Sequence, residues 1–171
     1  MKKTIKYIIL LLILGLIGFY FWPESPLDTS KKIDKILIIK HERKLIVFSN
    51  GEELKRYKIS LGKEPIGKKE FENDKKTPEG LYIINDKNPN SGFHLNLGVS
   101  YPNESDKRYA KKLNKNPGGQ IKIHGLRNGF GFIGKFHRFF DWTLGCIAVT
   151  NREIEELYDN VPKGTEIEII E

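Results

Sequence analysis

The apolar run at the N-terminus limits the folded part of this chain more than any other feature. Three lysines, Lys2, Lys3 and Lys6, precede sixteen uncharged and mostly apolar residues, Tyr7 to Trp22. A positively charged start followed by an apolar run is typical of a secretion signal or a signal anchor. Sixteen helical residues would be about 24 Å long, close to the roughly 30 Å hydrocarbon core of a bilayer. The rest of the chain must therefore supply the folded domain.

The sequence just after this run favours an uncleaved anchor over a cleaved signal. No small-x-small pair follows it, and Trp-Pro-Glu at 22–24 is a poor cleavage site. Phe19, Tyr20 and Trp22 would lie at the far membrane interface as an aromatic belt. A cleaved signal is the alternative. We expect a transmembrane anchor over 1–22 with its lysines inside, a polar linker over 23–32, and one domain over 33–171 outside the cytoplasm, in the cell envelope.

Short apolar and alternating segments predict that this domain is mostly β. Asn50-Gly51 is the strongest short hairpin signal. Polar caps and helical apolar spacing predict short helices over 103–114 and 150–161. Glycine-rich and proline-rich composition predicts loops over 62–80 and 127–140. The expected strands are 35–40, 43–49, 54–62, 81–86, 94–101, 120–126 and 166–170.

The charge balance narrows the class of partner. The net charge is +7, which fits nucleic acid, an anionic envelope polymer or a membrane surface. The lysines are scattered along the chain and do not form one stripe interleaved with aromatic residues. We therefore expect no nucleic-acid partner.

Cys146 is the only cysteine of the chain. In an exported protein a single cysteine cannot form an internal disulfide, so its thiol is intermolecular or functional. It follows a loop-like segment and precedes the helix expected from Thr150, where backbone N–H groups can stabilise an oxyanion and Gly145 lets substrate approach. A nucleophilic thiolate needs a base, and the candidates are His124 and His137.

Each of these three residues also has a plain structural interpretation. Cys146 could be a small buried apolar side chain. His124 could be a hydrogen-bonded core histidine, and His137, between Lys135 and Arg138, a solvated loop residue. Local sequence leaves both interpretations open.

Metal and nucleotide sites are disfavoured by spacing. The four histidines and one cysteine form no His-x-x-x-His or Cys-x-x-Cys pair, and His41 and His94 fall in separate expected strands. Gly129, Gly131 and Gly134 lack the strand-to-helix context of a dinucleotide loop. We expect no metal and no cofactor.

Several segments in a fixed order carry a family resemblance. The specific part is His-Gly followed by Thr-x-Gly-Cys and a helix. The whole set, from Ile33 to Glu171, resembles the L,D-transpeptidase catalytic domain (the YkuD fold), in particular its YafK-like branch. The segments are LGKEPIGKKEFENDKKTPEGLY, NPNSGFHLNLGVSYPN, PGGQIKIHG, DWTLGCIAVTNREIEELYDNV and GTEIEI.

This resemblance implies a β-sandwich-like, mostly antiparallel fold and a cysteine nucleophile. The implied substrate is a peptidoglycan stem peptide, cut between the L-centre of a diamino acid and the following D-alanine. By position, the nucleophile is Cys146 and the paired histidine is His124. Gly125 stands where the family orients the imidazole with a hydroxyl or a backbone carbonyl. Thr143 and Gly145 complete the Thr-x-Gly-Cys element.

Three places depart from the best-known members of the family. Leu144 and Ala148 stand where those members have His and Arg or Asn, and Leu144 cannot donate a hydrogen bond. We expect His137 or Asp141 to take over part of that work. The usual Glu-Gly-Asp is Glu-Asn-Asp at 72–74. The Asp-Trp-Thr lead-in suits the YafK-like branch, in which hydrolysis is an alternative to cross-linking.

The two long loops are candidate walls of the substrate site. Their cations could hold stem-peptide carboxylates, or they could be solvated surface charges. His124 would take the thiol proton, or hold it already as an ion pair, and a thioester would form. Three functions follow: a membrane-anchored L,D-transpeptidase, a peptidoglycan hydrolase such as an L,D-carboxypeptidase, or a non-catalytic envelope-binding domain. The wall cations are Lys68, Lys69, Arg127 and Arg138.

Overall fold

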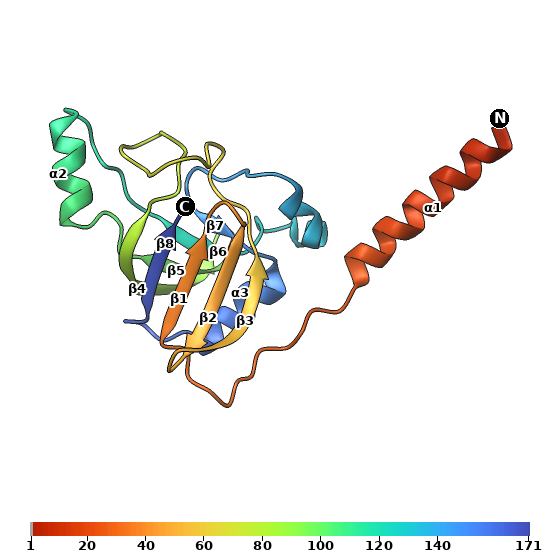
Figure 1. The fold of residues 1–171 in the computed structure, drawn as a ribbon, viewed down its shortest axis with the longest axis horizontal. Helices are drawn as coiled ribbons and strands as arrows, with labels where there is room; N and C mark the ends of the chain where they lie inside the picture. The colour runs from red at the N-terminus through yellow and green to blue at the C-terminus, as the bar shows by residue number, and fades with distance from the viewer. Residues whose placement is uncertain (1) are drawn as a thin grey trace.

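Most of helix α1 (Lys2–Phe21) extends away from the folded domain in the computed structural model, which describes residues 2–171, and only its C-terminal end contacts the domain (Figure 1). Its apolar stretch, Lys3–Phe21, has a mean hydropathy of 2.2 and is not buried against the rest of the chain. By length and composition α1 could cross a membrane, and a signal sequence passes the same test. The polar segment after α1 is held to the domain, because Leu27 is buried and its N–H donates to Glu156.

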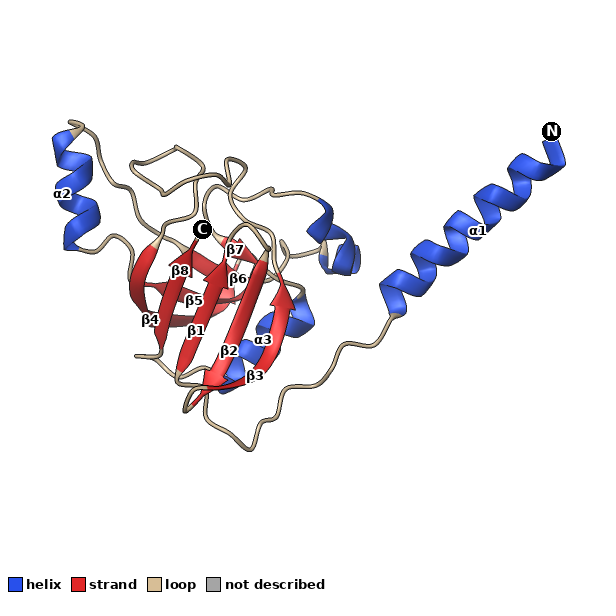
Figure 2. Cartoon of the chain, viewed as in Figure 1, coloured by secondary structure: helices blue, strands red, loops and turns tan. Residues whose placement is uncertain are grey.

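All strands belong to one curled sheet (Figure 2). Its order is β3-β2-β1-β8-β4-β5-β6-β7. The pairs β1–β8 and β6–β7 are parallel and the others are antiparallel. This confirms a mostly β, mostly antiparallel fold with few helices. The strands are β1 (Lys35–Ile39), β2 (Lys44–Ser49), β3 (Glu52–Lys58), β4 (Gly80–Ser91), β5 (His94–Val99), β6 (Lys122–His124), β7 (Ile147–Ala148) and β8 (Glu166–Ile170).

Strand β4 is shared by the two halves of the sheet. Its first residues, 80–83, pair with β8, and the residues from Ile84 onward pair with β5. The register shifts between Ile84 and Asp86, and such an irregularity bends a strand and increases its twist. The sheet therefore curls at β4. The expected strand 81–86 was too short, because Asn-Pro-Asn at 88–90 is typical of a turn but continues this strand.

The two edges of the sheet meet beside Cys146. After β3, Ser60 exchanges two backbone hydrogen bonds with Ala148 of β7, at 2.9 and 2.8 Å. Gly62 forms a further bridge with Thr143. A side chain at Gly62 would be impossible, because its Cβ would lie 2.0 Å from the carbonyl oxygen of Lys75. The strand predicted over 54–62 thus consists of two parts: β3, which ends at Lys58, and the closing segment that contains Ser60 and Gly62.

The helices begin at the predicted caps. In α3 (Asn151–Asn160) the Thr150 hydroxyl accepts from the N–H of Glu153, whose carboxylate accepts from the N–H of Thr150. Asn103 and Asp106 form the same reciprocal box at the start of α2 (Glu104–Lys112). The apolar face of α3 packs on β5 and β6 and is fully buried.

The hairpin turn at Asn50-Gly51 also forms as predicted. Both residues have positive φ, as a type I′ turn needs.

The expected loop 127–140 is wrong in part. It contains a 3₁₀ helix, η1 (Gly131–Phe139), which is kinked at Gly134 with φ 50° and ψ −132°. The glycines of this segment are typical of loops, but Gly134 absorbs the kink between two short helical turns.

Candidate active site

Parallel pairing of β6 with β7 brings Cys146 and His124 to the same place. Ile123 pairs with Ile147, so Cys146 precedes β7 by one residue and His124 ends β6. With strands about 4.8 Å apart and a rise of about 3.3 Å per residue, their Cα atoms are about 8 Å apart, within reach of two side chains. Both residues line one open cleft of about 730 Å³. Its lining also includes Lys63, Phe93, Asn96, Gln120, Lys122, Arg127, Trp142, Thr143 and Leu144.

The His124 imidazole is fixed by the backbone. Its Nδ1 lies 2.7 Å from the carbonyl oxygen of Gly125, which can only accept, so Nδ1 carries the proton and Nε2 is free to accept another. Phe93 and Trp142 flank the ring, with centroids 4.7 and 5.7 Å away. Burial lowers the pKa of His124 below its usual value, against the opposing effect of the Gly125 carbonyl. The ring is therefore neutral at pH 7.

The Cys146 thiol is also neutral at rest. Burial raises its pKa above 9.0, and the backbone and charge of Lys122 oppose this only in part. The thiol donates to the carbonyl oxygen of Gln120 at 3.4 Å. Of the two resting states left open by the sequence, burial thus favours thiol with neutral imidazole over a thiolate–imidazolium pair. A thiol in this state can act as a nucleophile only if a base takes its proton during the attack.

The Thr143 hydroxyl holds the loop that carries the cysteine. It accepts from the N–H of Gly145 at 3.1 Å and donates to the carbonyl oxygen of Cys146 at 2.7 Å. Gly145 has φ +128°, and a Cβ there would lie 2.6 Å from the carbonyl oxygen of Lys76. The N–H of Gly145 is thus used within the loop, whereas that of Cys146 has no acceptor among residues 2–171.

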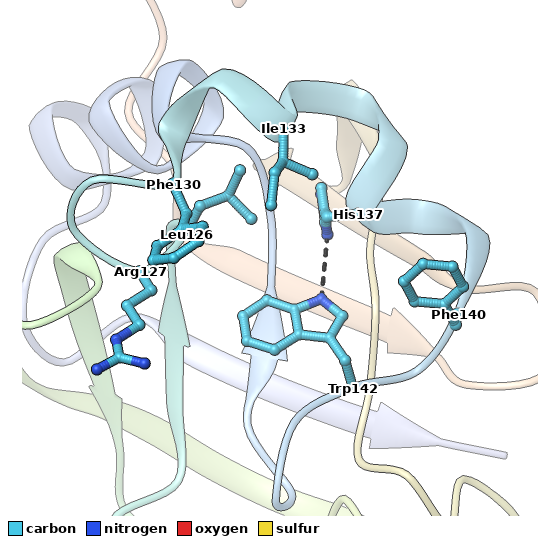
Figure 3. A pocket seen from close by; sticks show the side chains of 7 residues that line it. All are labelled: Leu126, Arg127, Phe130, Ile133, His137, Phe140 and Trp142. Carbon is cyan, nitrogen blue, oxygen red and sulfur yellow. Dashed lines mark hydrogen bonds between the residues drawn. The ribbon is translucent and has the colours of Figure 1, made fainter.

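His137 lies behind Trp142 and does not line the cleft. Trp142 Nε1 donates to His137 Nδ1 at 3.5 Å, and His137 Nε2 is buried with no partner among the described residues (Figure 3). Burial, with smaller contributions from Arg138 and His124, lowers the pKa of His137 to about 3. The Ser60 hydroxyl donates to the His137 carbonyl oxygen at 3.0 Å and lies 3.1 Å from Nδ1, so His137 joins Trp142 to the closing segment after β3.

Asp141 likewise stands outside the cleft. Its carboxylate accepts from the N–H of Leu61 at 2.8 Å and from Arg43 at 2.7 Å. These bonds tie the loop before Cys146 to the closing segment after β3. Neither His137 nor Asp141 thus replaces the hydrogen-bond donor that Leu144 lacks, and Leu144 itself is 67% exposed at the cleft.

A smaller and almost wholly apolar cavity of about 250 Å³ adjoins the cleft (Figure 3). Trp142 and Arg127 line both spaces. The other lining residues come from β6's end and from η1 and its flanks. They are Leu126, Phe130, Ile133, His137 and Phe140.

Three of the predicted wall cations do not line the cleft, contrary to expectation. Buried or half-buried carboxylates bind each of them elsewhere, and the sequence alone does not reveal those partners. The ion pairs are Lys68–Asp106 at 2.8 Å, Lys69–Asp74 at 2.7 Å, Arg138–Glu153 at 2.6 Å and Arg138–Glu24 at 3.1 Å. Only Arg127 of the four faces the cleft.

Two further cations and one amide at the cleft were not predicted from the sequence. Lys63 and Lys122 line the cleft together with Arg127, and no aspartate or glutamate of residues 2–171 does so. Asn96 is 3% exposed, lies opposite His124 in the β5–β6 register, and has no partner for its Oδ1 among the described residues. The sequence signal that could have indicated Asn96 is a polar amide residue within an otherwise apolar strand.

Residues 2–171 contain no group of three or more His, Cys, Asp or Glu side chains arranged to hold a metal ion.

Comparison with known proteins identifies the family. The family model of the L,D-transpeptidase catalytic domain (YkuD) matches residues 33–169. The chain belongs to this family. YafK of Escherichia coli strain K12 is 29% identical to this L,D-transpeptidase family member over 132 residues, 74% of this chain and 46% of YafK. The expected family and YafK-like branch are thus confirmed.

Solved structures agree with this assignment. The helical cell shape determining protein Pgp2 from Campylobacter jejuni is similar with a TM-score of 0.62 and 26% identity, over 82% of this chain and 48% of Pgp2. Bd1075 of Bdellovibrio bacteriovorus is similar with a TM-score of 0.58 and 30% identity, over 85% and 51% of the two chains. This L,D-transpeptidase family member spans about half the length of these relatives.

Proposed function

We propose that this chain is a cysteine-dependent L,D-transpeptidase of peptidoglycan stem peptides, anchored by α1 with its domain outside the cytoplasm. The observation that carries the proposal is the cleft shared by the only thiol and by a histidine whose Nε2 is free. Family membership supports the same chemistry. A cleaved signal in place of the anchor would leave the catalytic proposal unchanged.

The first step is acylation of Cys146. The sulfur attacks the carbonyl carbon of the diamino acid while His124 Nε2 takes the thiol proton. The carbonyl oxygen becomes negatively charged, and the N–H of Cys146 is the free donor beside it. One such donor typically stabilises the transition state by about 3–4 kcal/mol. The tetrahedral intermediate then collapses: the C–N bond breaks, His124 protonates the departing D-amino acid, and a thioester remains.

The second step decides between transfer and hydrolysis. If the amine of another stem peptide attacks the thioester, His124 takes its proton, the C–S bond breaks, and a cross-link forms. If water attacks instead, the product is a shortened stem peptide. The chain's similarity to Pgp2 makes wall remodelling that affects cell shape a reasonable role for either reaction.

The charges of the cleft suit a stem peptide. Lys63, Lys122 and Arg127 provide cations without an opposing carboxylate, and stem peptides carry carboxylates. Asn96, which lies opposite His124 in the β5–β6 register, borders the same cleft. We infer that these groups place the scissile amide over Cys146.

A hydrolase is the second candidate, and one observation favours it. The cleft is open, and the exposed Leu144 side chain borders Cys146, where a hydrogen-bonding residue could otherwise hold an acceptor. Water then has access to a thioester. A non-catalytic envelope-binding domain is the remaining alternative.

Intact mass after incubation with a carbapenem tests for a live nucleophile. We expect one adduct on the wild type, none on Cys146→Ala, and strongly slowed acylation of His124→Ala. His94→Ala is the matched control, because His94 pairs with the exposed Glu155 at 2.6 Å on the surface and should acylate normally. An unreactive wild-type thiol would favour the binding domain, and normal acylation of His124→Ala would remove His124 from its role.

Muropeptide analysis with the purified full chain separates the two enzymes. Cross-linked dimers or exchange of the terminal D-amino acid indicate transfer. Shortened stems alone indicate a hydrolase and would overturn the transpeptidase proposal while retaining the acyl-enzyme mechanism.

A further inference from the structure

Aromatic side chains are concentrated on the surface around η1. Five of the chain's ten phenylalanines lie within residues 130–140. Four of them form what we call the aromatic face, with exposed fractions of 47% for Phe130, 72% for Phe132, 59% for Phe139 and 67% for Phe140. Elsewhere on the domain the exposed large apolar residues form smaller groups, such as Leu81 and Ile83 on β4, which is ordinary for a soluble surface. A cluster of this kind indicates a contact with an apolar partner.

The C-terminal end of α1 packs on the same segment. The Phe19 ring stacks on Phe139 at 5.6 Å between centroids and contacts Phe136 at 6.0 Å. The Tyr20 hydroxyl donates to the carbonyl oxygen of Phe132 at 2.9 Å. The end of the apolar helix and η1 are therefore adjacent (Figure 1).

Polar bonds fasten this junction to the domain. The Lys135 ammonium donates to the carbonyl oxygen of Trp22 and pairs with Glu24 at 3.0 Å. Arg138 pairs with Glu24 at 3.1 Å and also with Glu153 of α3 at 2.6 Å. The side chain of Arg138 is buried, so η1 is held between the residues that follow α1 and the capped start of α3. The position of η1 relative to the C-terminal end of α1 is therefore fixed.

We propose that the aromatic face is a second membrane contact, inserted into the interfacial region of the bilayer that α1 crosses. This inference rests on the proposed anchor and is independent of the catalytic chemistry. Aromatic rings concentrate at the level of the lipid headgroups, which is where the end of a spanning helix lies. A short amphipathic helix with aromatic residues on its exposed side gains free energy by burying them there. Because η1 lies beside the outer end of α1, the outer leaflet of the bilayer is the surface that the aromatic face contacts.

The contact would set the orientation of the active site. Phe130 and Phe140 line the small apolar cavity (Figure 3), and Trp142 lines both that cavity and the cleft. With α1 and the aromatic face both in the bilayer, the domain cannot rotate freely on its linker. The cleft is then held close to the membrane surface, and it favours acyl donors within reach of that surface.

Site-specific quenching in vesicles tests this contact on the full chain. Because Cys146 is the only thiol, Cys146→Ser provides a cysteine-free background for single labels. An environment-sensitive fluorophore is attached to Phe132→Cys or Phe140→Cys, to Leu81→Cys on the exposed face of β4, and to Leu12→Cys within α1. The vesicles contain phosphatidylethanolamine and phosphatidylglycerol, with or without lipids that carry a nitroxide quencher near the headgroup.

We expect the labels at 132 and 140 to shift to the blue and to be quenched about threefold more strongly than the label at 81. Equal quenching at 132, 140 and 81, with the label at 12 buried in the bilayer, would overturn the aromatic contact while leaving the anchor intact. A label at 12 that stays in water would remove the anchor and this inference together. Neither result bears on the carbapenem adduct of the unlabelled wild type.

Discussion

Acidification from pH 7 to pH 5 should destabilise the domain through His137. This residue is held with a pKa of about 3, because it is buried and because Arg138 and His124 add unfavourable charge. Its Nδ1 lies 3.1 Å from the Ser60 hydroxyl and 3.5 Å from Trp142 Nε1, and its Nε2 has no partner among the described residues, so an imidazolium would leave its Nε2 proton without an acceptor. In the unfolded chain the same group titrates near 6.5.

The sign and size follow from proton linkage. Between the two pKa values the unfolded state binds a proton that the folded state does not, so the free energy of unfolding falls as the pH falls below about 6.5. Each full pH unit in that range lowers it by about 1.4 kcal/mol, and the drop from pH 7 to pH 5 is about 2 kcal/mol. His124 adds a contribution of the same sign. Most carboxylates of the unfolded chain titrate below this window.

Urea unfolding of the detergent-solubilised full chain at pH 7, 6 and 5, followed by near-UV circular dichroism, measures the effect. His137→Gln should be less stable than the wild type at pH 7, but the difference should shrink by about 2 kcal/mol at pH 5 because the variant lacks this titration. The exposed His41, changed to Gln, is the matched control and should keep the wild-type slope. A His137→Gln variant that also keeps that slope would refute a neutral buried imidazole.

Three further substitutions probe the loop, the junction and the cleft. Gly145→Ala should lose acylation and about 1–3 kcal/mol of stability, because its Cβ would meet the Lys76 carbonyl oxygen at positive φ; carbapenem adduct formation and thermal unfolding measure both. Arg138→Met should cost about 3–5 kcal/mol in urea unfolding, because it leaves Glu153 buried without its cation. Lys122→Gln should slow acylation and weaken its salt dependence, because it removes a cation beside the thiol.

Each substitution has a matched control in the chain. Gly119→Ala has room for a Cβ at ordinary φ and should acylate normally. Arg56→Met breaks a solvent-exposed pair with Glu53 and should leave the free energy of unfolding almost unchanged. Lys112→Gln, on the exposed end of α2, should leave acylation unchanged. Equal effects in a substitution and its control would contradict the local explanation.

Local signals predicted most elements of this fold. The Asn50-Gly51 turn and the caps at Asn103 and Thr150 depend on neighbouring residues only, and they are where the sequence placed them. The closure of the sheet between Ser60 and Ala148 joins residues far apart in the chain. No local pattern encodes that contact, which is why it was not predicted.

The candidate site shows the same division. The order of His-Gly and Thr-x-Gly-Cys was enough to expect His124 and Cys146 together, and the two line one cleft. A cation's charge is visible in a sequence but its partner is not. Arg138 was therefore expected near substrate, although Glu153 and Glu24 bind it elsewhere. The roles given to these residues remain predictions until the variants are measured.

The closure between Ser60 and Ala148 affects how easily the surroundings of Cys146 can open. This closure consists of an antiparallel bridge between Ser60 and Ala148 and a parallel bridge between Gly62 and Thr143, and Cys146 lies between Thr143 and Ala148 in the sequence. Separation of Ser60 from Ala148 would expose the Cys146 sulfur further while the rest of the sheet stays paired. Heat or mild denaturant should then disturb the loop around Cys146 before the whole sheet unfolds, so the rate of alkylation of this thiol measures how often the two edges of the sheet separate.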